Sequence, residues 1–275
     1  MPTPIPDNAL NVCEAAARAG GRVLLDWVGR FGVTHKGPRD VVTEADFASQ
    51  REIRRILLDA FPEHGFVGEE ALPEHAAEAG RPAAPLRWLV DPLDGTSNYV
   101  HGFPAWCSSV ALAAGDEILV GAIYDPTLDE CFTAERGGGA FLDGRRIGVA
   151  GTASLAEALV AVSFPAHVDV ASTAVADFLA VLPRAHSIRR TGSTALNLAW
   201  LACGRLDAFW VRRIAAWDVA AGLVILREAG GCLGGFGAAA DPTAAPEWVD
   251  VPLDHPAFVA ASTPALLGEL RQVLA

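Results

Sequence analysis

The first sixty residues contain two stretches in which apolar side chains recur at helical spacing. Between residues 8 and 30, apolar or small residues return every three or four positions, which predicts an amphipathic helix. Asp7 stands before this stretch as a helix N-cap. After a loop around residues 36–40, the segment 43–46 has the pattern of a capping box and opens a second predicted helix that continues to Phe61.

The pattern then changes to short β-like runs. Those before residue 150 are separated by turn signals such as Asp143-Gly144 and predict an antiparallel meander. The runs lie at residues 88–90, 107–113, 118–124 and 131–134.

After about residue 150, predicted strands and helices alternate, which is typical of a more parallel sheet. The strands lie at 159–163, 187–190, 206–211 and 258–262, and the helices at 170–182, 193–203, 218–229 and 264–274. The glycine- and alanine-rich residues 234–246 are predicted as a loop. The fold class is therefore mixed α+β and α/β. An N-terminal lobe at 1–150 holds an antiparallel sheet, and a C-terminal lobe at 151–275 holds a mostly parallel one.

Charge and composition exclude several classes of protein. The 275 residues are 51% hydrophobic, which supports a substantial core, and carry a formal net charge of −12, which disfavours nucleic acid as a partner. Every apolar run is shorter than the roughly 18–20 residues that a membrane span needs, and the N-terminus lacks the features of a secretory signal. We expect a cytoplasmic protein. The five scattered cysteines are expected to be buried thiols, and neither they nor the seven histidines have the spacing of a zinc site.

The most informative segment follows the run at 88–90 and reads Asp91-Pro92-Leu93-Asp94-Gly95-Thr96-Ser97-Asn98. A strand delivers two carboxylates to its end, where Pro92 and Gly95 force a turn. The two side chains and the Leu93 carbonyl are the oxygen ligands that Mg²⁺ prefers. A helix start after Gly95 would expose backbone N–H groups to a phosphate. On turn chemistry alone, a turn in which aspartate caps the chain is the more common interpretation of such a segment.

Three further acidic positions have two interpretations each. Glu69 and Glu70 follow a short apolar run, either as ligands at a strand end or as a solvated surface pair. Asp46 lies in the first turn of a helix, where the helix dipole alone favours it. Asp218 lies in one of the most apolar parts of the chain, so it needs a metal, a cation or backbone donors at a helix N-terminus.

Taken in order, these segments resemble the inositol monophosphatase family of Mg²⁺-dependent phosphomonoesterases. The resemblance spans most of the chain and rests on two specific motifs and several shorter matches. The motifs are Asp91-Pro92-Leu93-Asp94-Gly95-Thr96 and Trp217-Asp218-Val219-Ala220-Ala221-Gly222, and the shorter matches are Lys36, Asp40, Thr43-Glu44-Ala45-Asp46, Gly68-Glu69-Glu70, Gly192-Ser193-Thr194 and Glu228-Ala229-Gly230-Gly231. It implies a layered αβαβα sugar-phosphatase-like fold, a homodimer and inhibition by Li⁺.

The resemblance also implies roles for individual residues. Glu69, Asp91 and the Leu93 carbonyl would hold one Mg²⁺, and Asp91, Asp94 and Asp218 a second, with two or three ions per site. Thr96, near Asp46, would orient the attacking water together with Glu69. The residues implied to bind substrate are Gly95, Thr96, Gly192, Ser193, Thr194, Val211 and Lys36. Lys36 would offset phosphate charge, although a lone loop lysine is often simply solvated.

The chain departs from this family at the position that recognises the leaving group. Inositol-recognising members carry an acidic residue seven positions before the final aspartate, where this chain has Val211. Valine accepts no hydrogen bond and Arg212 and Arg213 follow it, so a less polyol-like or more anionic leaving group is expected. Arg189 and Arg190 either face the substrate or are surface charges.

The predicted function is Mg²⁺-dependent hydrolysis of a small phosphate monoester resembling inositol 1-phosphate. Histidinol phosphate, fructose 1,6-bisphosphate and 3′-phosphoadenosine nucleotides are alternatives from the same superfamily. From other classes, a non-catalytic interaction protein that retains the fold and a two-metal nuclease remain. The complete set of carboxylates disfavours the first, and the net charge disfavours the second.

Overall fold

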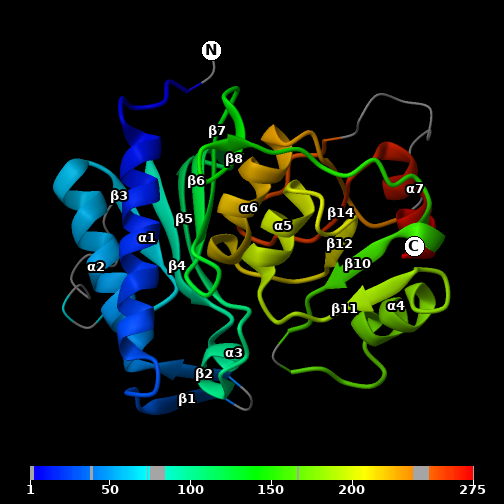
Figure 1. The fold of residues 1–275 in the computed structure, drawn as a ribbon, viewed down its shortest axis with the longest axis horizontal. Helices are drawn as coiled ribbons and strands as arrows, with labels where there is room; N and C mark the ends of the chain where they lie inside the picture. The colour runs from blue at the N-terminus through cyan, green and yellow to red at the C-terminus, as the bar shows by residue number, and fades with distance from the viewer. Residues whose placement is uncertain are drawn as a thin grey trace.

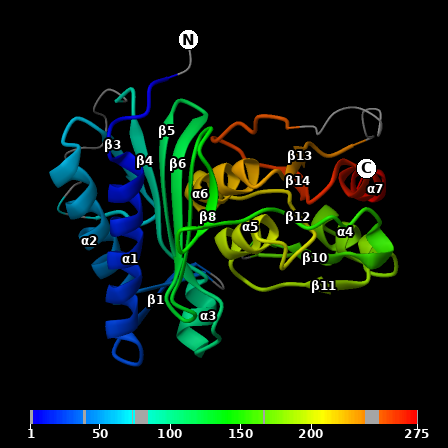
Figure 2. The ribbon, with the colours of Figure 1, turned by 45° about the horizontal axis from the view of Figure 1, so that its top comes forward.

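The computed structural model describes residues 3–37, 40–72, 74, 84–165, 167–237 and 248–274. These form five layers in the order helix, sheet, helix, sheet, helix (Figures 1 and 2). The predicted mixed αβ fold with layered architecture is confirmed. None of the helices in the described ranges is long and apolar enough to cross a membrane.

The first layer is formed by α1 (Ala9–Trp27) and α2 (Glu44–Ala60), which lie side by side on the large sheet (Figure 1). Both predicted helices are confirmed, and α1 buries small residues against the sheet. The predicted capping box is present at the start of α2. Thr43 Oγ1 accepts a hydrogen bond from the Ala45 backbone at 3.2 Å, and Asp46 accepts one from the Thr43 backbone at 2.8 Å.

The second layer is a seven-stranded sheet in the order β3-β4-β5-β6-β7-β8-β9. Its strands are β3 (Gly65–Gly68), β4 (Arg87–Asp94), β5 (Cys107–Ala114), β6 (Glu117–Asp125), β7 (Glu130–Glu135), β8 (Gly139–Leu142) and β9 (Arg145–Arg146). From β4 onward every pairing is antiparallel, as the meander predicts. The edge strand β3 differs because it runs parallel to β4, which brings the ends of both strands to the same edge of the sheet.

The middle layer contains α5 (Thr194–Ala202) and α6 (Ala216–Glu228), which lie between the two sheets (Figure 2). All eight residues from Val219 to Leu226 are buried, because α6 meets protein on every side. The largest cluster of buried apolar residues includes side chains from both sheets and both helices. The middle layer therefore connects the two predicted lobes, and their division at residue 150 stays a prediction.

The fourth layer is a five-stranded sheet in the order β11-β10-β12-β14-β13. Its strands are β10 (Leu159–Val162), β11 (Ser187–Arg189), β12 (Ala208–Val211), β13 (Cys232–Gly234) and β14 (Phe258–Ala261). Only β14 runs against the other four, so this sheet is mostly parallel as predicted. The outer layer contains α4 (Thr173–Val181) and α7 (Pro264–Val273), and the short 3₁₀ helix η2 (Leu155–Glu157) precedes β10.

The structure differs from the sequence prediction in two places. The predicted loop around residues 36–40 contains β1 (Val33–Gly37) and β2 (Asp40–Thr43), an antiparallel pair whose β1 side chains are largely exposed. Strand β13 was not predicted, and most of the predicted loop at 234–246 lies outside the described residues. The start of a helix after Gly95 is the short α3 (Thr96–His101).

Candidate active site

The end of β4 presents two carboxylates, Asp91 and Asp94, at a turn in the chain. Pairing with β5 shifts register between them, so the strand bulges there, and the Leu93 backbone N–H donates to Asp91 Oδ1 at 3.0 Å. Gly95 follows with φ of 96°, and a Cβ at this position would lie 2.8 Å from the Ala105 carbonyl oxygen. Only glycine fits this turn, which starts α3 directly beside the carboxylates.

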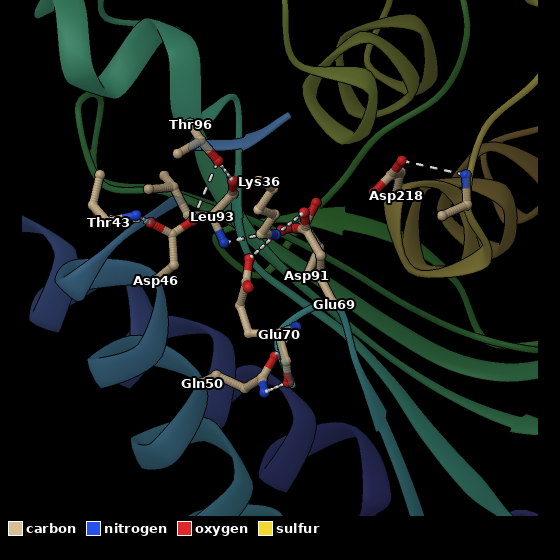
Figure 3. Close-up of polar contacts among 11 residues, drawn as sticks. Lys36, Thr43, Asp46, Gln50, Glu69, Glu70, Asp91, Leu93, Thr96 and Asp218 are labelled. Atoms are coloured by element: carbon tan, nitrogen blue, oxygen red, sulfur yellow. Dashed lines mark hydrogen bonds and ion pairs between the residues drawn. The ribbon is translucent and has the colours of Figure 1, made fainter. Parts of the chain in front are cut away.

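Three carboxylates from separate parts of the chain meet at this point. Glu69 directly follows β3, Asp91 is in β4, and Asp218 is in the first turn of α6 (Figure 3). Each offers an oxygen atom within 4.8 Å of the others. Glu69 is brought there by the parallel pairing of β3 and β4, which continues in a hydrogen bond from its backbone to the Val90 carbonyl at 3.0 Å. We call Glu69, Asp91 and Asp218 the carboxylate cluster.

Asp94 lies beside the cluster and is bound by the N-terminus of α5. Its Oδ2 accepts hydrogen bonds from Ser193 Oγ and from the Ala195 backbone, both at 2.6 Å. Ser193 is fully buried and also caps α5 through Leu196 at 3.3 Å. The hydroxyl is therefore used to position Asp94, and the implied contact of Ser193 with substrate stays a prediction.

Replacing Ser193 by alanine tests this positioning role. Loss of the hydroxyl leaves Asp94 free to rotate, and outer-shell changes of this kind typically weaken metal affinity about 10-fold or more. We expect the Mg²⁺ concentration for half-maximal activity to rise by about that factor, with kcat at saturating Mg²⁺ changing less. Ser154→Ala, at a half-buried serine that bonds only to Glu157 among the described residues, is the matched control. An unchanged Mg²⁺ requirement in Ser193→Ala would refute the role.

Asp46 is fully buried and reaches the site through Thr96. One carboxylate oxygen of Asp46 accepts from the hydroxyl and the backbone of Thr43, at 2.6 and 2.8 Å. The other lies 3.3 Å from Thr96 Oγ1, which in turn lies 3.0 Å from the Leu93 carbonyl oxygen (Figure 3). Thr96 is thus held between Asp46 and Leu93, with its orientation fixed from both sides.

Lys36, on β1, extends its ammonium group toward the cluster. Its Nζ lies 3.2 Å from Glu69 Oε1 and 2.5 Å from Glu70 Oε1 (Figure 3). Glu70 is buried and is fixed at its backbone by two hydrogen bonds with Gln50, at 2.6 and 2.9 Å. The prediction of a solvated surface pair is therefore wrong for Glu70, and Lys36 is not simply solvated.

Burial and mutual repulsion raise the pKa values of the acidic groups at this site. Burial is the larger cause for Asp218, whose pKa is raised to about 8, and the charges of Asp94 and Glu69 add to it. The pKa of Asp91 is raised for the same two reasons, and that of Asp94 is raised to about 6 by burial despite the hydrogen bond from Ser193. Burial opposes the charge of Lys36, but Glu69 and Glu70 outweigh it and raise its pKa. The carboxylates thus repel one another, and the charge of Lys36 does not balance theirs.

A cavity of about 720 Å³ opens over the cluster. Nine of the residues predicted to form the site line it: Glu69, Asp91, Leu93, Asp94, Gly95, Thr96, Gly192, Thr194 and Asp218. Gly192 has φ of 90°, and a Cβ there would lie 2.8 Å from the side-chain amide of Asn98, so glycine is required at this wall. Arg190 also lines the cavity, whereas Arg189 bonds to Ser187.

Val211 does not lie in the cavity wall. Its side chain is 1% exposed at the end of β12, where the strand pairs with Phe258, and it belongs to the central apolar cluster. The expectation that Val211 contacts substrate is therefore wrong. A residue here is enclosed on all sides by the core.

Replacing Val211 by glutamate should consequently destabilise the protein. An unpaired carboxylate in this position costs several kcal/mol of unfolding free energy. We expect a fall in the midpoint of urea denaturation, whereas Val211→Met, an apolar control, should change it much less. If Val211→Glu kept its stability and gained turnover of polyol phosphates, its side chain would have to reach the cavity after all.

Several residues of the site had no clear signal in the sequence. Part of the cavity lining is apolar, and its members come from β10, the segment before α4, α4 itself and the loop before α6. They are Val162, Phe164, Val168, Val175 and Ile214. Ordinary apolar residues of this kind give no motif. Asn98, in contrast, is part of the motif that begins at Asp91. Its side-chain amide donates to the carbonyl oxygens of Ala105 and Thr191 at 2.7 and 2.8 Å, which joins α3 to the loop after β11.

The donor set fits a divalent cation. The cluster supplies only anionic oxygens, which suit a hard ion such as Mg²⁺. Asp91 is buried and Glu69 and Asp218 are half-buried, and the three lie close enough to repel one another without a cation. The oxygens of Glu69, Asp91 and Asp218 lie within 4.8 Å of one another, so a cation between them would offset their mutual repulsion. The geometry therefore supports the interpretation of these groups as metal ligands over that of turn caps.

The five-layer fold and this site define a phosphoric monoester hydrolase of a metal-dependent class. The model of the inositol monophosphatase family matches residues 6–271, and the chain belongs to this family. It is 42% identical over 227 residues to an inositol-1-monophosphatase of Rhizobium meliloti (strain 1021), covering 81% of this chain and 83% of the relative.

Two other similar proteins carry different descriptions. The chain is 39% identical over 238 residues to the Nus factor SuhB of Xylella fastidiosa, covering 85% of this chain and 84% of that one. The crystal structure of extragenic suppressor protein SuhB from Bartonella henselae superimposes with a TM-score of 0.83 and 34% identity, covering 98% of both chains. Relatives with one fold and one family thus carry both enzymatic and non-enzymatic names.

Proposed function

We propose that this protein hydrolyses a small phosphate monoester, resembling inositol 1-phosphate, in a Mg²⁺-dependent reaction. The observation that carries the proposal is the meeting of Glu69, Asp91 and Asp218 under one cavity. Similarity to an inositol-1-monophosphatase supports the choice of substrate class.

Each ligand is assigned to one of two ions. Glu69, Asp91 and the Leu93 carbonyl would hold the first, and Asp91, Asp94 and Asp218 the second, with Asp91 shared between them. Bound ions of this kind activate the attacking water and neutralise the leaving oxygen, so that no covalent phosphoenzyme is needed.

The remaining residues orient the reactants and handle charge. Thr96, held by Asp46 and Leu93, directs its hydroxyl oxygen at the position of the attacking water, and Glu69 accepts the proton of that water. Gly95 and Thr96 present backbone N–H groups to the phosphate. Lys36 compensates phosphate charge. Its ammonium group lies at hydrogen-bond distance from Glu69 and is therefore beside the site.

A phosphate-release assay with and without Mg²⁺ tests this proposal. The panel contains inositol 1-phosphate, histidinol phosphate, fructose 1,6-bisphosphate and a 3′-phosphoadenosine nucleotide. We expect turnover that requires Mg²⁺ and is lost with EDTA. Absence of turnover for every substrate, in protein that binds Mg²⁺, would favour an interaction protein that retains the fold. The relative named as a Nus factor makes this the alternative to exclude.

We further propose a cytoplasmic homodimer that Li⁺ inhibits. Multi-angle light scattering of the purified chain should give about twice the 28.8 kDa of one chain. A Li⁺ titration at fixed Mg²⁺ should lower activity by occupying one of the ion positions. A monomer, or activity that Li⁺ leaves unchanged, would refute the corresponding part.

A further inference from the structure

A second cavity, of about 760 Å³, adjoins the one over the carboxylate cluster. The two share Ile214 and Asp218, so the space beyond the cluster continues past the start of α6. The other residues lining it are Pro165, Arg212, Arg213, Ala215, Asp254, His255, Pro256 and Ala257. A phosphate at the cluster therefore leaves room for a leaving group that extends into the second cavity.

Arg212 is not free to bind a ligand there. Its guanidinium donates twice to Asp177 on α4, once at 2.9 Å, and once to the Leu274 carbonyl at 3.0 Å. Its Cζ also lies 3.9 Å from the centroid of the Phe236 ring. A bidentate ion pair with a buried carboxylate, together with a stacked ring, fixes this side chain in place. Arg212 thereby anchors the loop that follows β12.

Arg213 is the next residue of the anchored loop and is exposed. Within the described ranges it has no hydrogen bond or ion pair, although it lines the second cavity. Asp254 lines the same cavity and is also exposed, so it is the acidic group available to Arg213 besides Asp218. The chain has a net charge of −12, but an unpaired guanidinium beside the active site attracts anions locally.

One part of the wall of the first cavity is apolar. Phe164, Val168 and Val175 offer no hydrogen bonds to a polyol, whereas Ser163, Arg190 and Thr194 of the same lining can bind polar groups. A leaving group whose polar group is bound outside this apolar part of the wall suits the cavity better than a polyol does. A planar fork of donors such as that of Arg213 matches a phosphate group well.

We propose that Arg213 determines specificity by binding a second phosphate carried on the leaving group, so that the preferred substrates are bisphosphates. This inference rests on the proposed phosphatase function and deepens it. The phosphate that is hydrolysed lies at the carboxylate cluster, the body of the leaving group packs along the apolar wall, and its own phosphate lies in the second cavity. Water attacks the first phosphate only, and the second is released unchanged with the product alcohol.

Two matched pairs of substrates test the inference. Adenosine 3′,5′-bisphosphate is compared with adenosine 3′-phosphate, and fructose 1,6-bisphosphate with fructose 1-phosphate, with the products identified so that the same ester bond is scored. In at least one pair, we expect wild-type kcat/KM to be about 10-fold higher or more for the bisphosphate. Arg213→Ala should remove most of that preference through KM, with kcat for the monophosphate retained.

Three further variants locate the effect. Arg213→Lys should restore part of the preference. Asp254→Asn should increase it, because the acidic group available to Arg213 is removed. Arg145→Ala, which removes an exposed charge at the edge strand β9, should leave it unchanged.

Different failures identify which proposal is wrong. A wild-type enzyme that hydrolyses monophosphates as well as bisphosphates, or a preference that Arg213→Ala leaves intact, overturns the inference and leaves the phosphatase function standing. Loss of the preference in Arg190→Ala instead would also overturn it, because Arg190 lines the first cavity. No Mg²⁺-dependent turnover of any phosphate ester overturns both.

Discussion

Asp91→Asn should lower Mg²⁺-dependent turnover by well over 100-fold. Changes to groups that merely support metal ligands cost about 10- to 100-fold, and Asp91 is proposed to bind both ions directly. Asparagine preserves the shape of the side chain and the oxygen that accepts from the Leu93 backbone. It removes the charge, however, and presents an amide N–H₂ to the cations. The measurement is phosphate release over a range of Mg²⁺ concentrations, supported by calorimetric titration of Mg²⁺.

The stability of this variant separates loss of ligands from loss of fold. The pKa of Asp91 is raised by burial and by the charges of Glu69 and Asp218, so its ionised form destabilises the metal-free protein. Asp91→Asn should therefore melt at the same temperature as the wild type, or higher, in EDTA at pH 8. Asp59→Asn, at an exposed aspartate of α2, controls for the loss of one charge. Retention of Mg²⁺-dependent turnover in Asp91→Asn would contradict the metal assignment.

The metal-free protein should lose stability as the pH rises from about 4 to about 8. The carboxyl groups of Asp91, Asp94 and Asp218 have a pKa near 3.8 when the chain is unfolded, and the folded protein raises it, to about 8 for Asp218. Between these values the folded state holds more protons than the unfolded state, so the free energy of unfolding falls as pH increases. Each pKa unit of difference between the folded and unfolded states corresponds to about 1.4 kcal/mol. The three carboxyl groups together therefore lower the free energy of unfolding by several kcal/mol over this pH range.

Mg²⁺ should reverse this dependence. The ion replaces the protons and binds best once they have left, so its stabilising effect should grow with pH. In thermal melts with EDTA, we expect the midpoint at pH 8.5 to lie on the order of 10 °C below that at pH 5.5. Added Mg²⁺ should raise the midpoint at pH 8.5 much more than at pH 5.5. Equal Mg²⁺ effects at both pH values would mean that the cluster is not the binding site.

The metal ligands could be predicted from the sequence because each stands beside a local signal. Asp91 and Asp94 are separated by Pro92, which cannot continue a regular strand, and followed by Gly95, whose positive φ forces the turn. Asp218 stands out as a charge in a run of apolar residues that proves to be buried on all sides. The outer helix α1 kept its expected periodicity, since one of its faces is buried against the large sheet, whereas the central elements α6, β4 and β5 are buried almost throughout.

The surroundings of the site could not be predicted in the same way, because they depend on packing between distant segments. Ser193 was predicted to bind substrate, but in the fold its hydroxyl donates a hydrogen bond to Asp94, 99 residues away in the chain. Val211 stands at a family position associated with substrate, yet in this chain its side chain packs in the core. The strand β1 was missed because its exposed side chains have no apolar alternation.

The position of α6 between the two sheets has a consequence for the order of synthesis. The helix carries Asp218, which comes after every other proposed ligand in the chain and reaches the cluster only when α6 packs against the N-terminal sheet. A nascent chain that has emerged from the ribosome only as far as β12 would hold Glu69, Asp91 and Asp94 without their last partner. We expect such a chain to bind Mg²⁺ weakly and to be inactive, so that the appearance of tight Mg²⁺ binding would mark the completion of folding.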